Sequence, residues 1–430
     1  MQKLCCSLVA LSLLGSAFAG EVIEPIKSTK NQLAQYLSVE EMNSIQSAKD
    51  EVAIYLSKGD VVPDEVKYSS DCYFSGYLQA LIDTSYSDQS VIVFAKTIYD
   101  TKENKRVRKI YLTNMPKNEM LRRSVQNFVK DVKGVDKKEV YILEDVPPEE
   151  AELREQYVSR PKMTGVWFPQ MTELFQPLIA DPRNVTYILG YRSGDHVIGT
   201  NCINIALGDD FGVYRWVDVL GHGDIQVGIE SGIWSVFNLS PSPNPFGGTE
   251  LVNTDFYFGI PITYAKGKWS FRLRGYHISS HLGDEYMQNH PETIETRVNP
   301  SVEAVDFFSS YQITEAIRLY VGPGAYVHSD PTYRWQPMYI EYGTEARFLG
   351  HRFYNQKMHG TLFFAMHWRN LQQLHWNFDG TYRAGYEFSK IQGVGRKFRA
   401  WAGYHHGYSL EGQFQKLKTH YWEFDINYGF

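Results

Sequence analysis

The chain has 430 residues, of which 15% are aromatic, and a formal net charge of −6 with a pI of about 6.1. A nucleic-acid-binding domain is expected to be basic, so this charge argues against nucleic acid as a partner. The 30 tyrosines and 9 tryptophans, with many glycines, favour a membrane β-protein, and a secreted β-sandwich is the alternative.

Residues 1–19 are predicted to be a secretory signal peptide. Lys3 precedes a short apolar stretch that ends in the small-residue cleavage pattern Ala17–Ala19. This arrangement is typical of an exported chain, and the stretch is too short for a membrane helix. The cysteines left after cleavage are Cys72 and Cys202, which we expect to lie in different domains without a disulfide.

Residues 20–64 are predicted to form a helical amino-terminal segment. Ser38 and Glu41 have the spacing of a capping box, in which each side chain accepts from a backbone N–H of the first helical turn. The pattern predicts a helix from this point to about Leu56, with Gly59 just beyond its end.

Residues 65–145 are predicted to form a small α/β domain. The order is helix, strand, strand, helix, strand, at residues 76–85, 91–99, 106–113, 118–133 and 138–143. The second helix is amphipathic, with its apolar residues at helical spacing on one face. A generic periplasmic α/β module is one interpretation of this pattern.

Three short stretches of this domain, Gly76–Tyr77, Lys109–Leu112 and Phe128–Val135, resemble the bacterial BON domain. The resemblance implies an association with phospholipid or with other components of the cell envelope. Residues 146–184 are then predicted to be a linker, because an acidic, proline-containing run opens them.

From residue 185 to residue 430 the chain is predicted to be a transmembrane antiparallel β-barrel of about 12 strands. Apolar and polar residues alternate along successive segments that turn residues separate. In the last segment Trp422, Phe424 and Ile426 alternate with Glu423 and Asp425. Side chains on a strand point to opposite faces with a period of two, so the apolar set is expected to face lipid.

The terminal strand is expected to pair with the first barrel strand near Tyr187 and so to close the barrel. The inward-facing positions carry arginines and carboxylates at high density, including Arg272, Arg383 and Glu387. Opposed charges of this kind predict either a lumen filled by ion pairs or a narrow pore.

Three motifs of this region are Leu178–Arg183, His277–Tyr286 and Gly407–Phe414. Together they resemble a bacterial outer-membrane β-barrel family known only as a domain of unknown function. The resemblance covers about Trp167 to Phe430. It implies an outer-membrane β-barrel but no established activity. We expect the amino-terminal domain of such a chain to lie in the periplasm.

His277 and Ser279 are the candidate catalytic residues. They share the outward parity of one strand, where polar side chains are costly, and an imidazole so close to a hydroxyl can activate it as a nucleophile. The pair resembles the His-x-Ser of outer-membrane phospholipase A and of the outer-membrane lipid A deacylase. The alternative is a pair of polar residues at headgroup depth.

The resemblance implies a third residue, Asn or Glu, that orients the histidine from the next strand. Asn299 and Glu303 are the candidates here. The expected parity of that strand places Val298, Val302 and Ala304 on the outer face.

A metal site formed by His277, His281, Asp284 and Glu285 is a second hypothesis, with a polar turn as its alternative. The sequence contains no phosphate loop, paired-cysteine metal site or nucleotide motif, and it leaves any cofactor unknown.

Three functions therefore stay open. The first is a binding or passage protein in the outer membrane with an unknown ligand, the second is a lipid acyl-ester hydrolase that uses Ser279 and His277, and the third is a structural envelope anchor. Outer-membrane lipids are the expected partners in each case, with envelope components as further partners of the amino-terminal domain.

Overall fold

A computed structural model describes residues 39–57, 67–100, 104–143, 164–169, 172–241, 248–353, 358–390 and 394–430. The predicted signal peptide lies outside these residues. The chain divides into two compact units, one within residues 1–80, 93–111 and 141–162, and one within residues 81–92, 112–140 and 163–430.

The amino-terminal elements follow the predicted order. They are α3 (Val39–Ser57), α5 (Asp71–Ser85), β1 (Ile92–Asp100), β2 (Lys105–Thr113), α6 (Glu119–Lys130), the 3₁₀ turn η1 (Lys137–Glu139) and β3 (Val140–Ile142). The strands form one sheet in the order β1-β2-β3. No helix in the described parts of the chain is long and apolar enough to span a membrane. The likeness to a BON domain stays a prediction.

Helix α6 begins where its sequence provides a cap. The side chain of Asn118 accepts a hydrogen bond from the backbone N–H of Leu121 at 3.1 Å, which satisfies one of the donors that a helix start leaves unpaired. Its apolar stripe is buried at Leu121, Val125 and Val129. In the sheet, Phe94 and Tyr111 stack with ring centroids 5.3 Å apart.

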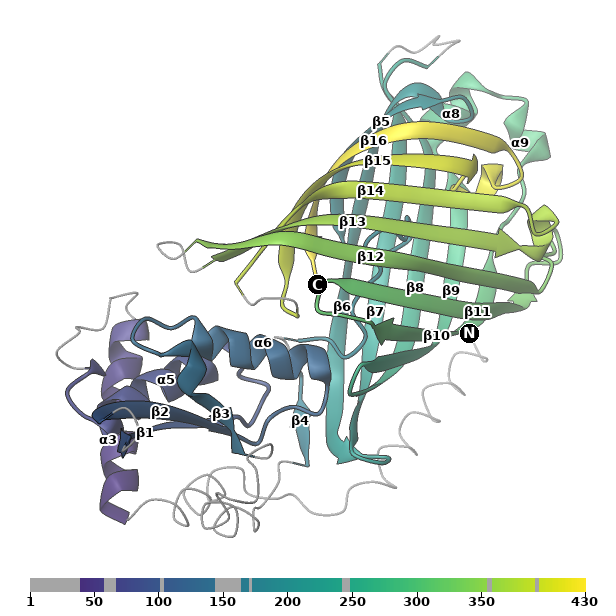
Figure 1. The fold of residues 1–430 in the computed structure, drawn as a ribbon. Helices are drawn as coiled ribbons and strands as arrows, with labels where there is room; N and C mark the ends of the chain where they lie inside the picture. Colours follow the sequence, from purple (N-terminus) through teal and green to yellow (C-terminus); the bar gives the residue numbers. More distant parts are fainter. Residues whose placement is uncertain are drawn as a thin grey trace. The chain divides into compact units, whose positions relative to one another are not determined.

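Twelve antiparallel strands close into a barrel, as the alternating pattern predicts (Figure 1). They are β5 (Tyr187–Asp195), β6 (Gly199–Val219), β7 (Gly223–Asn238), β8 (Glu250–Lys266), β9 (Trp269–Leu282), β10 (Val302–Gln312), β11 (Ile317–Ser329), β12 (Met338–Phe353), β13 (Met358–Leu371), β14 (Phe378–Ser389), β15 (Lys397–Tyr408) and β16 (Lys418–Gly429). A short strand, β4 (Gly165–Trp167), pairs with the far end of β6.

The loops of the barrel carry four short helical elements. These are α8 (Asp284–Asn289) and α9 (Thr293–Thr296) between β9 and β10, η5 (Gln372–Leu374) and η6 (Gly412–Phe414). They lie at the barrel end opposite the carboxyl terminus, because each follows an odd-numbered strand and β16 runs the other way.

The seam between the last and first strands has the predicted pairing. Tyr428 lies opposite Tyr187, and Phe424 lies opposite Tyr191, in an antiparallel register. Trp422 and Phe424 are more than half exposed on the outside, whereas Glu423 is 2% exposed inside the lumen. The parity of the terminal strand therefore predicted both its faces correctly.

Ion pairs fill much of the lumen, as the inward charges predict. Arg383 lies 2.6 Å from Glu423, Arg347 lies 2.8 Å from Glu387, and Arg369 lies 2.6 Å from Asp379. All six of these side chains are less than 15% exposed. A buried charge without a partner is strongly destabilising, so such a lumen requires near-complete pairing.

Residues 172–186 run inside the barrel. The sequence predicted a linker over residues 146–184, and the part from residue 172 onward belongs to the barrel interior instead. The backbone N–H of Ile179 donates to Glu345 at 2.9 Å, and Arg383 donates to the carbonyl oxygen of Ile179 at 2.7 Å. The carbonyl oxygen of Gln176 accepts from Arg318 at 2.7 Å. These arginines and Glu345 point inward from the wall. This lumen segment (residues 172–186) is therefore hydrogen-bonded to the inner surface of the barrel.

Candidate functional site

Three polar side chains lie on the outer face of β9 near the loop end of the barrel. His277, Ser279 and His281 share this face, as predicted, while Ser280 between them is 3% exposed on the inner face. On a strand, side chains two positions apart stand on one face about 7 Å apart along the chain. The histidine and serine are therefore neighbours on the surface that meets lipid.

The parity predicted for β10 was wrong. Val302 and Ala304 are buried inside the barrel at 0% and 2% exposure, and Glu303 between them faces outward. A β-bulge interrupts the pairing of β10 with β11 at Glu303 and Ala304, and Asp306 further along points into the lumen. Glu303 lies directly opposite His277 in the pairing of β10 with β9.

Glu303 and His277 are in contact across the two strands. Nδ1 of His277 lies 3.0 Å from Oε1 of Glu303, and Nδ1 of His328 on β11 lies 2.5 Å from Oε2 of the same carboxylate. The side chains of His277 and Glu303 are 43% and 46% exposed. A carboxylate at Nδ1 fixes the imidazole's orientation and leaves Nε2 for a second partner.

Within the described residues no hydrogen bond joins Ser279 to His277. Catalytic hydrogen bonds are often long in an enzyme without its substrate and tighten when the substrate binds. The backbone places the hydroxyl of Ser279 and the imidazole of His277 on one face of β9.

Asn299 takes no part in this arrangement. It lies in the loop before β10, where its amide donates to Asp330 at 2.9 Å. Of the two sequence candidates for the orienting residue, only Glu303 approaches His277. The proposed metal ligands also stay apart: Asp284 and Glu285 open helix α8, and no three of the four candidate ligands gather in the described chain.

Apolar side chains surround the His277–Ser279–Glu303 cluster. Phe256 and Phe258 on β8 lie opposite Ser279 and His277, and they are 45% and 48% exposed. On β10, Val305 and Phe307 continue the outer face beyond Glu303 and are similarly exposed. An exposed apolar surface of this extent is typical of the outer, hydrocarbon-facing side of a membrane barrel.

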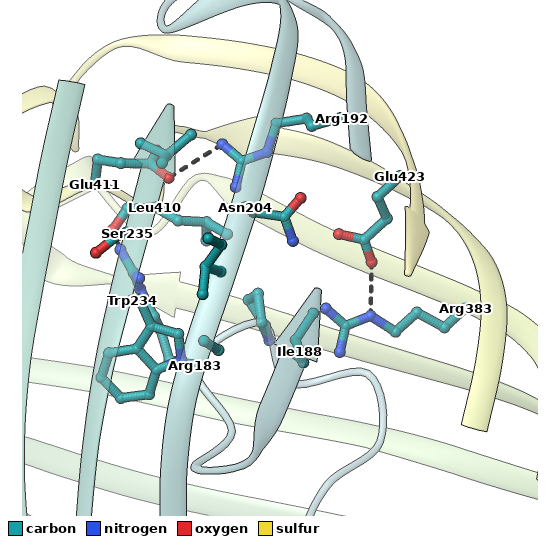
Figure 2. Close-up of a pocket in the computed structure, with 14 residues that line it drawn as sticks. Arg183, Ile188, Arg192, Asn204, Trp234, Ser235, Arg383, Leu410, Glu411 and Glu423 are labelled. Carbon is teal, nitrogen blue, oxygen red and sulfur yellow. Dashed lines mark hydrogen bonds and ion pairs between the residues drawn. The ribbon is translucent and has the colours of Figure 1, made fainter. Parts of the chain in front are cut away.

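The lumen offers little space at the seam. A cavity of about 30 Å³ lies there. Two ion pairs line it, Arg192 with Glu411 at 3.0 Å and Arg383 with Glu423 at 2.6 Å, and both are drawn as dashed lines in Figure 2. Such a volume holds about one or two waters. Burial alone raises the pKa of the Glu411 carboxyl, but the guanidinium groups of Arg192 and Arg183 outweigh burial and lower this pKa to about 2.

The sequence matches one protein family. Residues 112–430 match the model of a family described as a protein of unknown function (DUF1207). No curated protein matches the sequence.

The barrel is similar in fold to solved outer-membrane proteins. Outer membrane phospholipase A from Escherichia coli is 12% identical with a TM-score of 0.38, and the match covers 59% of this chain and 98% of that one. The Salmonella typhi outer membrane phospholipase dimer with bound calcium is 11% identical with a TM-score of 0.38, and the match covers 57% of this chain and 93% of that one. The NanC porin is 10% identical with a TM-score of 0.30, and the match covers 57% of this chain and 98% of that one. At these identities the likeness concerns the fold alone.

Proposed function

The chain belongs to the DUF1207 family, and we propose that it is an outer-membrane hydrolase of lipid acyl esters, with Ser279 as nucleophile, His277 as general base and Glu303 as the orienting carboxylate. The observation that carries the proposal is the 3.0 Å contact between Nδ1 of His277 and Glu303 on the lipid-facing surface. Two ionisable groups on that surface are costly, and a catalytic role explains their position.

The reaction follows from this arrangement. Nε2 of His277 takes the proton of Ser279 as Oγ attacks the ester carbonyl carbon, and the resulting imidazolium is stabilised by Glu303. The same proton passes to the departing alcohol as the ester bond breaks. Water then attacks the acyl-serine with His277 again as base, which releases a fatty acid and restores the serine.

The position along the barrel favours lipids of the outer leaflet. His277 is nearer the end of β9, and Glu303 is near the start of β10, so both approach the long loop at residues 283–301. Outer-membrane barrels have short periplasmic turns and longer extracellular loops. We therefore infer that the cluster faces the outer leaflet and that the amino-terminal α/β domain lies in the periplasm.

A passage role has less support. The lumen segment at residues 172–186 is hydrogen-bonded to the wall through Arg318, Glu345 and Arg383. An open pathway requires its displacement together with several buried ion pairs. We expect the purified chain to show no steady conductance in planar bilayers. A stable open channel there would favour passage over hydrolysis.

The test of the hydrolase uses the full chain in detergent. Wild-type protein is expected to release labelled fatty acid from an ester-labelled phospholipid and to react covalently with a fluorophosphonate probe. Ser279→Ala loses both signals, with a rate loss of about 10⁴-fold or more. The control is Ser309→Ala on the outer face of β10, which keeps both. Equal hydrolysis by Ser279→Ala and wild type would exclude this nucleophile.

A further inference from the structure

A second group of polar side chains lies inside the lumen, where the lumen segment meets two strands of the wall. Asp181 belongs to the segment, Glu341 to β12 and His367 to β13. One ligand atom from each of the three lies within 4.8 Å of the others. These residues have no place in the proposed hydrolase site, which is on the opposite surface of the wall.

The hydrogen bonds of His367 determine which of its ring nitrogens carries a proton. The hydroxyl of Tyr320 donates to the carbonyl oxygen of Met366 at 3.2 Å, and it lies 3.1 Å from Nδ1 of His367. A tyrosine hydroxyl has one proton, so once it has donated to Met366 it accepts from Nδ1–H. Nε2 of a neutral His367 then carries a lone pair.

That lone pair points toward negative charge. His367 is 1% exposed, and within the described residues its Nε2 has no hydrogen-bond partner. The nearest acidic atom is Oε2 of Glu341, at 3.6 Å. A buried acceptor without a donor costs free energy, and two carboxylates beside it add repulsion. Something positive between the three groups removes both costs.

Neighbouring arginines do not fill this role, because each has nearer acids. Arg274 lies 2.5 Å from Asp306 and 3.1 Å from Glu230, and Arg369 lies 2.6 Å from Asp379. The space between Asp181, Glu341 and His367 is therefore left for a cation of another kind.

We propose that Nε2 of His367 and the carboxylates of Asp181 and Glu341 bind a divalent transition metal ion of the zinc class. One imidazole and two carboxylates suit such an ion, and at bond lengths of about 2.0–2.2 Å its ligands stand roughly 3.5 Å apart, close to the His367–Glu341 spacing. Nδ1–H of His367 donates to the hydroxyl of Tyr320. A metal-binding histidine is usually oriented by such a hydrogen bond from its other ring nitrogen.

The ion has two consequences for the barrel. It ties the lumen segment to β12 and β13 through Asp181. It also keeps one coordination position open, because Asp181 and Glu341 line a cavity of about 100 Å³ inside the lumen. A water or a small anion in that cavity completes a four-coordinate site.

The test measures metal retention by the full chain. Purified protein is stripped with a chelator, incubated with Zn²⁺, passed through gel filtration and assayed for zinc, with folding checked by heat-modifiable mobility in SDS gels. Wild type is expected to retain about one ion per chain, and Co²⁺ in its place to give visible d–d bands. His367→Gln and the less buried Glu341→Gln each lose the ion.

The matched control is His405→Gln on β15. His405 is 0% exposed and its Nε2 lies 3.7 Å from Asp379, yet both ring nitrogens have partners, Thr381 at 3.0 Å and the carbonyl oxygen of Tyr408 at 2.9 Å. This variant is expected to keep the zinc. A folded wild type without zinc would overturn the proposal. Equal retention of zinc by Glu341→Gln and wild type would also overturn it, because the ion would then be bound elsewhere in the chain.

Discussion

Nδ1 of His277 lies 3.0 Å from Oε1 of Glu303 on the outer face of the barrel, across the pairing of β9 with β10. This exposed pair has little value as a structural bond, since even fully charged exposed ion pairs stabilise proteins by at most about 1 kcal/mol. Its effect on the orientation of the imidazole is specific, because a carboxylate at Nδ1 selects the tautomer that presents Nε2 as a base.

Substitution of Glu303 therefore separates an orienting role from a structural one. Glu303→Ala is expected to lower phospholipid hydrolysis by about 10²- to 10⁴-fold while the barrel stays folded. Glu303→Gln is expected to retain more activity than the alanine variant, because its amide oxygen still accepts from Nδ1. Rates of hydrolysis of an ester-labelled phospholipid by the two variants check both expectations. Equal rates for the two variants would argue against orientation of His277 by this side chain.

The alternating pattern was sufficient to predict the barrel, its closure and most of its parity. Alternation carries this information because lipid and lumen impose opposite polarity on the two faces of each strand. It could not reveal the lumen segment, since residues 172–186 have no periodic pattern. Their burial results from contacts with Arg318, Glu345 and Arg383, which lie far along the chain.

The error at Glu303 has a simple physical origin. A transmembrane strand normally places apolar residues outward and polar residues inward. Near the loop end of β10 the inward positions hold the apolar residues Val302 and Ala304, so the normal polarity is reversed there. The middle of the strand keeps the rule: Asp306 is buried and Phe307 is exposed. Parity counted from that point places Glu303 outside. Strand centres lie in hydrocarbon, so they predict which side chains face outward more reliably than strand ends do. The contact of His328 with Glu303 depends on a bulge that no pattern reveals.

The pairing of Arg383 with Glu423 is expected to dominate the stability of the lumen. Arg383→Met leaves Glu423, 2% exposed, without its 2.6 Å partner and also frees the carbonyl oxygen of Ile179. The expected loss is about 3–5 kcal/mol in the free energy of unfolding, measured by urea titration in detergent. Arg396→Met is the control, because its pair with Asp209 is partly exposed and should contribute at most about 1 kcal/mol. Similar losses for both variants would contradict this prediction.

Acidification is expected to destabilise the barrel through Glu411 in the loop between β15 and β16. A pKa of about 2 in the folded loop, below the ordinary 4.5, means that folding favours the ionised carboxylate. Its contribution of about 3 kcal/mol is present above pH 4.5 and is lost as the pH falls through 4.5 toward 2. Urea midpoints of wild type should fall over this range, and those of Glu411→Gln should fall less steeply. Parallel curves for the two proteins would exclude Glu411 as the source.

The seam itself can be tested by cross-linking, because closure requires one register between β16 and β5. Leu189 and Ile426 lie opposite each other and are 59% and 50% exposed on the outer face. Cysteines at these positions have Cβ atoms about 4.5–5.5 Å apart, near the range of a disulfide. In a background where Cys72 and Cys202 are replaced by serine, oxidation should join the ends of the barrel and increase mobility in non-reducing SDS gels. The diagonal pair Leu189→Cys with Phe424→Cys is the control, because cysteines about 7–8 Å apart should not bridge. A disulfide in the diagonal pair and none in the direct pair would mean that the strands pair in a register shifted by two residues.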